Sequence, residues 1–205
     1  MRSILRKIKS IIRKTLTFPV QAYYTVAGSQ FECNICHYKT NRFDSDSWHE
    51  FSICPRCRSQ VRHRLLWAAL MKLPDFSAEK ILRNKSILHF APEVLLGKQF
   101  KKLTHQYKTA DFFTEGYHYD NIDYNLDMSN MKVIADHSID CLVALDVLEH
   151  IPDHKKAMRE IYRVLKKDGV CILTVPQKDS LDVTEEDLSL NDPKEREKRF
   201  GQFDH

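Results

Sequence analysis

The chain has 205 residues, 42% of them hydrophobic, which is enough for one domain of ordinary size plus a small additional one and excludes global disorder. Its net charge of +4 is uneven, since residues 1–75 hold 13 Lys and Arg against 5 Asp and Glu, whereas the remainder is acidic. No apolar run approaches the roughly 18 residues of a membrane-spanning helix, and the charged N-terminus does not fit a secretory signal.

The first predicted element is a basic amphipathic helix over residues 2–16, within an N-terminal segment of residues 1–30. Lys and Arg occupy much of its surface, and its apolar side chains share one stripe: Ile4, Leu5, Ile8, Ile11, Ile12 and Leu16. Such a helix could lie on an anionic membrane surface, which would place the protein at the inner face of the membrane. An ordinary docking helix or a frayed basic terminus is the alternative.

Residues 31–58 contain two C-x-x-C pairs separated by 17 residues. These pairs are Cys33 with Cys36 and Cys54 with Cys57. The spacing is typical of zinc ribbons, in which four thiolates surround one ion tetrahedrally and leave no coordination position open. We therefore expect a structural zinc module, and thiols kept for a metal point to a cytoplasmic protein. Two unrelated thiol pairs or a redox site remain the alternative.

Residues 59–82 are predicted to connect this module to a larger domain. A helix is expected over residues 59–72, with Ser59 as its N-cap. Arg62, His63 and Arg64 could contact an anionic acceptor from this helix, and a solvated helix face is the alternative.

Residues 83–205 alternate between short apolar runs and helical patterns. The runs cover residues 86–90, 107–113, 121–126, 139–145 and 170–175. The clearest helical pattern covers residues 153–167 and is predicted to end at Asp168-Gly169. Strands alternating with helices predict an α/β fold with a Rossmann-like, doubly wound and mostly parallel sheet.

Residues 138–176 carry a series of short motifs within this pattern. In order, these are Asp140, Leu148-Glu149-His150, Asp153, Arg163-Val164-Leu165 and Gly169. In order and spacing they resemble the fourth strand, the following helix and the fifth strand of class I S-adenosylmethionine-dependent methyltransferases. Lys167-Asp168-Gly169 replaces the usual Pro-Gly-Gly.

The resemblance implies S-adenosylmethionine as cofactor and assigns residues to its site. Asp111, after the second strand, would bind the ribose hydroxyls, and Asp127, after the third, would address the adenine amino group. The first cofactor loop would include His89, Ala91 and Glu93, and Asp146 would line the site after the fourth strand. That first loop departs from the family, because it lacks glycine and Pro92 has no N–H to donate.

His150 and Glu149 are the candidate catalytic residues. A hydroxyl acceptor must lose a proton during methyl transfer, and His150 would follow the fourth strand at the ligand-binding edge of the sheet. The alternative is that both residues cap and orient the next helix. In a variant of the catalytic hypothesis, Asp146, Glu149 and His150 share one helical turn and bind a divalent metal.

Taken with the paired cysteines, the first-loop motif and a closing Phe-Gly-Gln-Phe-Asp-His at residues 200–205, the chain resembles a bacterial methyltransferase-like family with an N-terminal zinc module. That family implies an acceptor that is a small molecule or is linked to a glycan. Its members continue past this closing motif, so the resemblance implies a C-terminally truncated methyltransferase domain.

Two other functions stay open at this stage. The chain could be a non-catalytic scaffold, which the glycine-poor loop and the missing C-terminal strands favour. It could also be an RNA methyltransferase, which the basic N-terminal part favours. Acidic residues within residues 31–58 argue against nucleic-acid binding. The sequence does not predict an oligomeric state.

Overall fold

The computed structural model describes residues 29–45, 50–113, 122–176, 187, 190 and 192–200. The predicted helix over residues 2–16 and the closing motif from Gly201 onward lie outside these residues. The chain forms two compact units that divide after Ser77. In the described part of the chain, no helix combines the length and the apolar character needed to span a membrane.

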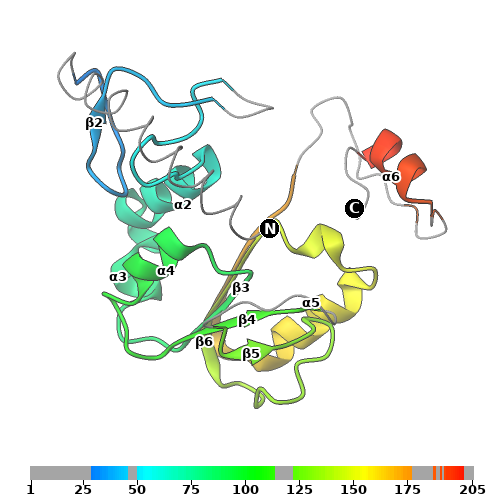
Figure 1. The fold of residues 1–205 in the computed structure, drawn as a ribbon. Coiled ribbons are helices and arrows are strands. Elements are labelled where there is room, and N and C mark those ends of the chain that lie inside the picture. The colour runs from blue at the N-terminus through cyan, green and yellow to red at the C-terminus, as the bar shows by residue number, and fades with distance from the viewer. Residues whose placement is uncertain are drawn as a thin grey trace, which may run out of the picture. The chain divides into compact units, whose positions relative to one another are not determined.

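Within its described residues, the first unit contains short strands followed by helical segments (Figure 1). Strands β1 (Phe31–Glu32) and β2 (Lys39–Thr40) form an antiparallel pair. A second antiparallel contact joins Asp44 to Ile53. Helix α2 (Val61–Lys72) and the 3₁₀ helix η1 (Pro74–Phe76) complete the unit.

The second unit is built on a five-stranded sheet in which all neighbours are parallel, in the order β5-β4-β3-β6-β7. Its elements, in chain order, are α3 (Ala78–Ile81), β3 (Ile87–Phe90), α4 (Val94–Phe100), β4 (Tyr107–Asp111), β5 (Tyr124–Asn125), β6 (Ile139–Leu145), η2 (Leu148–His150), α5 (His154–Val164), β7 (Leu165–Thr174) and α6 (Pro193–Phe200). This topology confirms the predicted Rossmann-like fold, in which the strand order reverses between β3 and β6.

Alternate residues of the central strands pack on opposite faces of the sheet. Leu88, Phe90 and Leu142 share a core cluster with Ile161 and Val164 of α5. On the other face, the ring of His89 contacts the rings of Phe100 and Tyr107, and Phe100 is the last residue of α4. Helices α4 and α5 therefore cover opposite faces of the sheet (Figure 1).

The passage from α5 to β7 differs from the prediction. The helix ends at Val164, and Leu165 already pairs with Ile139 of β6. The carbonyl of Val164, in the last turn of the helix, accepts the N–H of Ser138, the residue before β6, at 2.9 Å. Residues 166–169 then form a bulge, and regular pairing resumes with Val170 opposite Cys141. Lys166 to Gly169 therefore belong to the bulged first part of β7 and not to a helix end.

Candidate functional site

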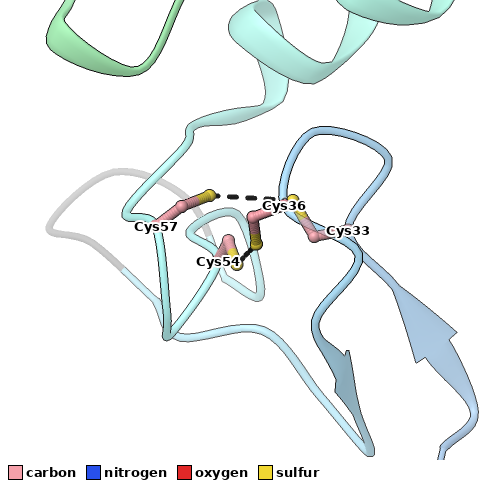
Figure 2. A group of neighbouring side chains, drawn as sticks. All are labelled: Cys33, Cys36, Cys54 and Cys57. Carbon is pink, nitrogen blue, oxygen red and sulfur yellow. Dashed lines mark hydrogen bonds between the residues drawn. The ribbon is translucent and has the colours of Figure 1, made fainter. Parts of the chain in front are cut away.

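The four paired cysteines form one cluster in the first unit (Figure 2). Their Sγ atoms all lie within 4.8 Å of one another, and the pairs Cys33–Cys57 and Cys36–Cys54 are each separated by 3.7 Å. A tetrahedron of sulfurs about 2.3 Å from a zinc ion has edges of about 3.8 Å. The cluster therefore has the size that a four-thiolate zinc site requires.

The two cysteine loops have the same hydrogen-bond pattern. In the first loop the Cys33 N–H donates to Tyr38, and in the second the Cys54 N–H donates to Ser59, at 3.0 and 2.9 Å. In each loop the residue four places after the first cysteine donates its N–H back to that cysteine's carbonyl, His37 in one case and Arg58 in the other. Two equivalent loops facing one another are what the C-x-x-C spacing predicts for a zinc ribbon.

Ser59 and Arg64 support this cluster. The Ser59 hydroxyl lies 3.2 Å from the Cys57 sulfur and 3.5 Å from the Cys33 sulfur. The Arg64 guanidinium bonds the Ser59 carbonyl and, at 2.8 Å, the Ser52 carbonyl, and it stacks 4.4 Å from the ring centroid of Phe43. Arg64 thus joins α2 to the cysteine loops and is not free to bind an acceptor.

The start of α2 also differs from the prediction. Gln60 is the N-cap, and its N–H donates to Nδ1 of His63 at 3.1 Å. Ser59 does not cap the helix, because its hydroxyl lies against the cysteine sulfurs. His63 is buried. Neither His63 nor Arg64 therefore offers its side chain to a ligand in the way the sequence suggested.

The charge state of the cysteine cluster depends on its internal contacts. A hydrogen bond from Cys54 lowers the pKa of Cys33 to about 3, although burial opposes this shift. The same contact, together with burial, raises the pKa of Cys54, and burial raises the pKa of Cys36 to about 11. Because zinc binds thiolates, binding of a divalent metal to the cysteines whose pKa is raised would release protons.

In the second unit, predicted cofactor residues lie where neighbouring parallel strands end. Ala91 follows β3, Asp111 ends β4 and Asp146 follows β6. These ends are in register, since the Ala91 N–H donates to Ala110 at 2.9 Å and the Asp146 N–H donates to Thr174 at 3.0 Å. The strand order reverses here, and ligands of open α/β sheets bind at such a point.

Two residues at this edge have a backbone conformation that normally favours glycine. Ala91 has φ 42° and Asp146 has φ 54°. Left-handed backbone turns the chain sharply at the ends of β3 and β6. Glycine usually provides the tight turn after the first strand of such a sheet. Here Ala91 makes this turn, so the absence of glycine from the loop does not remove the turn.

Asp111 has the features of a ligand-binding carboxylate. Its Oδ1 accepts the Phe112 N–H at 2.8 Å, and no partner of Oδ2 is found among the residues that the structure describes. Burial raises the pKa of Asp111 above its usual value, and the hydrogen bond from Phe112 opposes this shift. A half-buried carboxylate with one uncommitted oxygen is suited to accept hydrogen bonds from ligand hydroxyls.

Asp127 and Asp146 are both bonded within the protein. Asp127 folds over Ser129, accepting its N–H at 2.7 Å and its hydroxyl at 2.9 Å. Asp146 Oδ1 accepts the Thr174 hydroxyl at 2.7 Å, which links the ends of β6 and β7. The Asp127 carboxylate oxygens have further lone pairs, so these contacts leave Asp127 able to accept from a ligand.

His89 lies behind this edge. Its ring is fully buried on the α4 face, where Nδ1 lies 2.9 Å from the Tyr107 hydroxyl and Nε2 lies 3.0 Å from Glu93 Oε2. Direct contact between this ring and a ligand at the sheet edge is incompatible with such burial. Its contact with Glu93 instead holds the carboxylate of that residue in the first loop.

Glu149 and His150 lie in the 3₁₀ helix η2, and His150 is exposed. They do not cap α5, since Asp153 is its N-cap and accepts the Lys156 N–H at 2.8 Å. The structure does not bring Asp146, Glu149 and His150 together as a metal set: within the described residues, the four cysteines are the one group whose ligand atoms lie close enough to share an ion. The left-handed Asp146 and the short 3₁₀ turn keep these residues off a single α-helical turn.

Residues 97–173 match the family model described as a methyltransferase domain. This match runs from α4 to the penultimate residue of β7 and includes Asp111, Asp127, Asp146 and the η2 residues. No curated protein matches the chain.

Similar solved structures have low identity to this chain. A candidate methyltransferase of Bacillus halodurans is 19% identical, with a TM-score of 0.43, over 67% of this chain and 57% of that one. A candidate S-adenosylmethionine-dependent methyltransferase of Methanococcus maripaludis is 18% identical, with a TM-score of 0.37, over 47% and 50%. The methyltransferase CalH, in complex with S-adenosylhomocysteine, is 19% identical, with a TM-score of 0.36, over 44% and 31%. The chain spans between a third and somewhat over half of these proteins, and TM-scores this low identify no activity.

Proposed function

We propose that the second unit is a class I methyltransferase domain that binds S-adenosylmethionine at the carboxyl edge of its sheet. The observation that carries this proposal is the position of Asp111, half-buried at the end of β4 with one oxygen uncommitted among the described residues. It lies inside the segment that matches the methyltransferase-domain model. The doubly wound topology supports the proposal, because it brings the strand ends together at the point where strand order reverses.

Bound S-adenosylmethionine supplies a methyl group activated by its sulfonium, so the protein needs chiefly to bind and orient two reactants. Asp111 would accept the ribose hydroxyls, Asp127 would offer a remaining lone pair, and Asp146 would line the site after β6. Ala91 would bring backbone close to the cofactor, and Glu93 is held beside it by His89. The residues at this edge therefore fit the cofactor.

His150 is the proposed general base for a hydroxyl acceptor. It is exposed, and it lies four residues past the left-handed Asp146 that ends β6. A His150→Gln variant should then bind the cofactor as the unchanged chain does and lose methyl transfer to hydroxyl acceptors. An equal loss of cofactor affinity would instead make His150 part of the binding site.

The proposal includes a structural Zn²⁺ held by Cys33, Cys36, Cys54 and Cys57. Four sulfurs at tetrahedral spacing fill the coordination shell, so this metal would stabilise the first unit and take no part in methyl transfer. Metal analysis of the purified chain should find one zinc per molecule. A Cys54→Ser variant should lose it.

The acceptor is proposed to be a small molecule or a glycan-linked group in the cytoplasm. We also propose that residues 2–16 recruit the protein to the inner membrane surface. Vesicles containing anionic lipid should then bind the full chain in a salt-dependent manner. Equal binding to neutral and anionic vesicles would contradict electrostatic recruitment.

Calorimetric titration of the zinc-loaded chain with S-adenosylmethionine and S-adenosylhomocysteine tests the central claim. Micromolar binding that is lost in Asp111→Ala would support the cofactor site and justify a screen of acceptors. A folded protein that binds neither compound would overturn the proposal and favour a non-catalytic scaffold. The glycine-free loop at Ala91 and Pro92 is the feature that would explain that outcome.

A further inference from the structure

A concave surface beside α5 has a strongly positive lining. The depression has a volume of about 580 Å³ and is lined by Ser129, Asn130, Lys132, Lys156, Arg159, Glu160 and Arg163. Four of these seven residues are cationic and one is acidic. The residues of the loop after β5 form one wall, and residues of α5 form the other. Cavities of about 300–1,000 Å³ accommodate small-molecule ligands, so the volume is sufficient for one.

Two residues of the lining, Glu160 and Arg163, form an ion pair with each other. The Arg163 guanidinium bonds both oxygens of Glu160 at 2.8 Å and the carbonyls of Met131 and Ile134 at 2.9 and 3.0 Å. Glu160 also accepts the Met131 N–H at 2.7 Å. The hydrogen bond from Arg163 lowers the pKa of Glu160, so this carboxylate stays ionised and its charge is balanced by its partner. Arg163 and Glu160 therefore hold the loop against α5 and add little net charge to the depression.

The other cations of the lining are Lys132, Lys156 and Arg159, of which Lys156 interacts electrostatically with Glu160. All three are exposed, and within the described residues none of them forms an ion pair. Lys156 and Arg159 lie on α5 about one turn apart, and Lys132, in the loop after β5, lines the same depression. Asn130 adds a side-chain amide donor to the same lining, whereas the Ser129 hydroxyl donates to Asp127 at 2.9 Å. Three exposed cations that line one depression favour a ligand with at least two negative charges.

We propose that this depression binds the phosphate or diphosphate group of a small molecule. Arg159 can donate two parallel hydrogen bonds to a phosphate, and the two lysines can neutralise its further charge. The lining contains no aromatic side chain on which a nucleobase could stack, so a single-stranded nucleic acid is a poorer match than a compact anion. The depression lies on the α5 face of the sheet, and its lining shares no residue with the proposed cofactor site, although Ser129 of the lining is bonded to Asp127 of that site.

Inorganic pyrophosphate is the probe that tests this proposal. Titration of the full zinc-loaded chain should show saturable binding at low salt that weakens as the salt concentration rises. Backbone amide NMR signals of residues 129–132 and 156–163 should shift during the titration. The double variant Lys132→Gln/Arg159→Gln should bind roughly tenfold more weakly or worse, because two charge-assisted contacts are lost.

A matched control removes the same charge from the opposite face of the sheet. Lys98 of α4 and Lys102 just after it are both exposed, and Lys98→Gln/Lys102→Gln should retain full pyrophosphate affinity. Thermal unfolding of both double variants checks that each is folded. Equal weakening by the two double variants would mean attraction by net charge alone and would overturn the proposal.

Two further results would overturn it. A folded, unchanged chain that binds no pyrophosphate at low salt has no such site. Binding of a single-stranded oligonucleotide through Lys132 and Arg159, with no competition from pyrophosphate, would assign the surface to nucleic acid. Titration with succinate separates phosphate recognition from general anion binding, and equal affinity for succinate would contradict the assignment to phosphate.

Discussion

His37 and Arg58 occupy the same position in two equivalent cysteine loops, and both adopt left-handed backbone, with φ 57° and 62°. Each donates its N–H to the carbonyl of the first cysteine in its loop, at 2.8 and 2.9 Å. Left-handed backbone costs a residue with a Cβ of the order of 1 kcal/mol or more. The loops keep this conformation because it brings both cysteines of each pair toward one point.

Replacing His37 by glycine should stabilise the zinc-bound first unit. Glycine relieves the strain of the positive φ, and its greater freedom in the unfolded chain offsets part of the gain, which leaves an expected net stabilisation of about 1 kcal/mol or less. His37→Ala is the matched control, because it removes the same exposed contact with Glu32 and keeps the strained backbone. Thermal unfolding of the zinc-loaded variants should rank glycine above alanine. The reverse order would contradict a strained loop.

Removing the Ser59 hydroxyl should weaken zinc binding. This hydroxyl lies 3.2 Å from the Cys57 sulfur, and partners of metal ligands typically contribute 10- to 100-fold in affinity. Competition with a chelator should therefore show Ser59→Ala releasing zinc at lower chelator concentration, whereas Ser59→Thr, which keeps a hydroxyl, should be affected less. If alanine and threonine behave alike, the hydroxyl does not support the ligands.

Replacing Asp111 by asparagine should stabilise the cofactor-free protein and abolish cofactor binding. Burial raises the folded-state pKa of Asp111 above 3.8, so the folded chain binds protons more readily than the unfolded chain does. The ionised Asp111 carboxylate therefore destabilises the folded chain at neutral pH. This destabilisation disappears as the pH falls through the raised folded-state pKa toward the pKa of the unfolded chain. Unfolding at several pH values should show the variant more stable at pH 7, with the difference shrinking toward pH 4. A variant that is less stable at pH 7 would show that Asp111 has a structural role.

The sequence predicts the fold where its pattern is long and regular. The apolar run over residues 139–145 coincides with β6, and the spacing of the paired cysteines predicts a cluster that the structure contains. Strand ends are less well predicted, since the run over residues 121–126 yields only Tyr124–Asn125 as strand. Helix α6 is not predicted, because the region after Pro176 carries no strong apolar period.

The interior of the candidate site could not be predicted from the sequence. Nothing near His89 in the chain indicates that its ring meets Tyr107 and Glu93, because two of these residues come from different strands and the third from a loop. The sequence also predicts that α5 reaches Asp168-Gly169, because Lys166 and Lys167 continue the helical pattern of the residues before them. Pairing of Leu165 with Ile139 ends the helix earlier, and tertiary pairing of this kind overrides local propensity.

The effect of Gly97→Ala on stability should depend on the residue at position 107. The substitution should be destabilising when Tyr107 is present and neutral or stabilising when phenylalanine replaces it. A Cβ at Gly97 would lie 2.7 Å from the Tyr107 hydroxyl, which is held in place by its hydrogen bond to His89. This overpacking should cost about 1–3 kcal/mol and outweigh the gain of up to about 1 kcal/mol that alanine brings to a helix.

In a Tyr107→Phe background the obstructing oxygen is absent, and the next ring atom lies 3.4 Å from the position that the alanine Cβ would occupy. The helix-propensity gain should then dominate, so that Gly97→Ala becomes neutral or stabilising. Denaturant unfolding of the four chains in this double-mutant cycle gives the coupling energy directly. Additive effects of the two substitutions would show that the hydroxyl is free to move aside, and that the His89 bond does not fix the ring against α4.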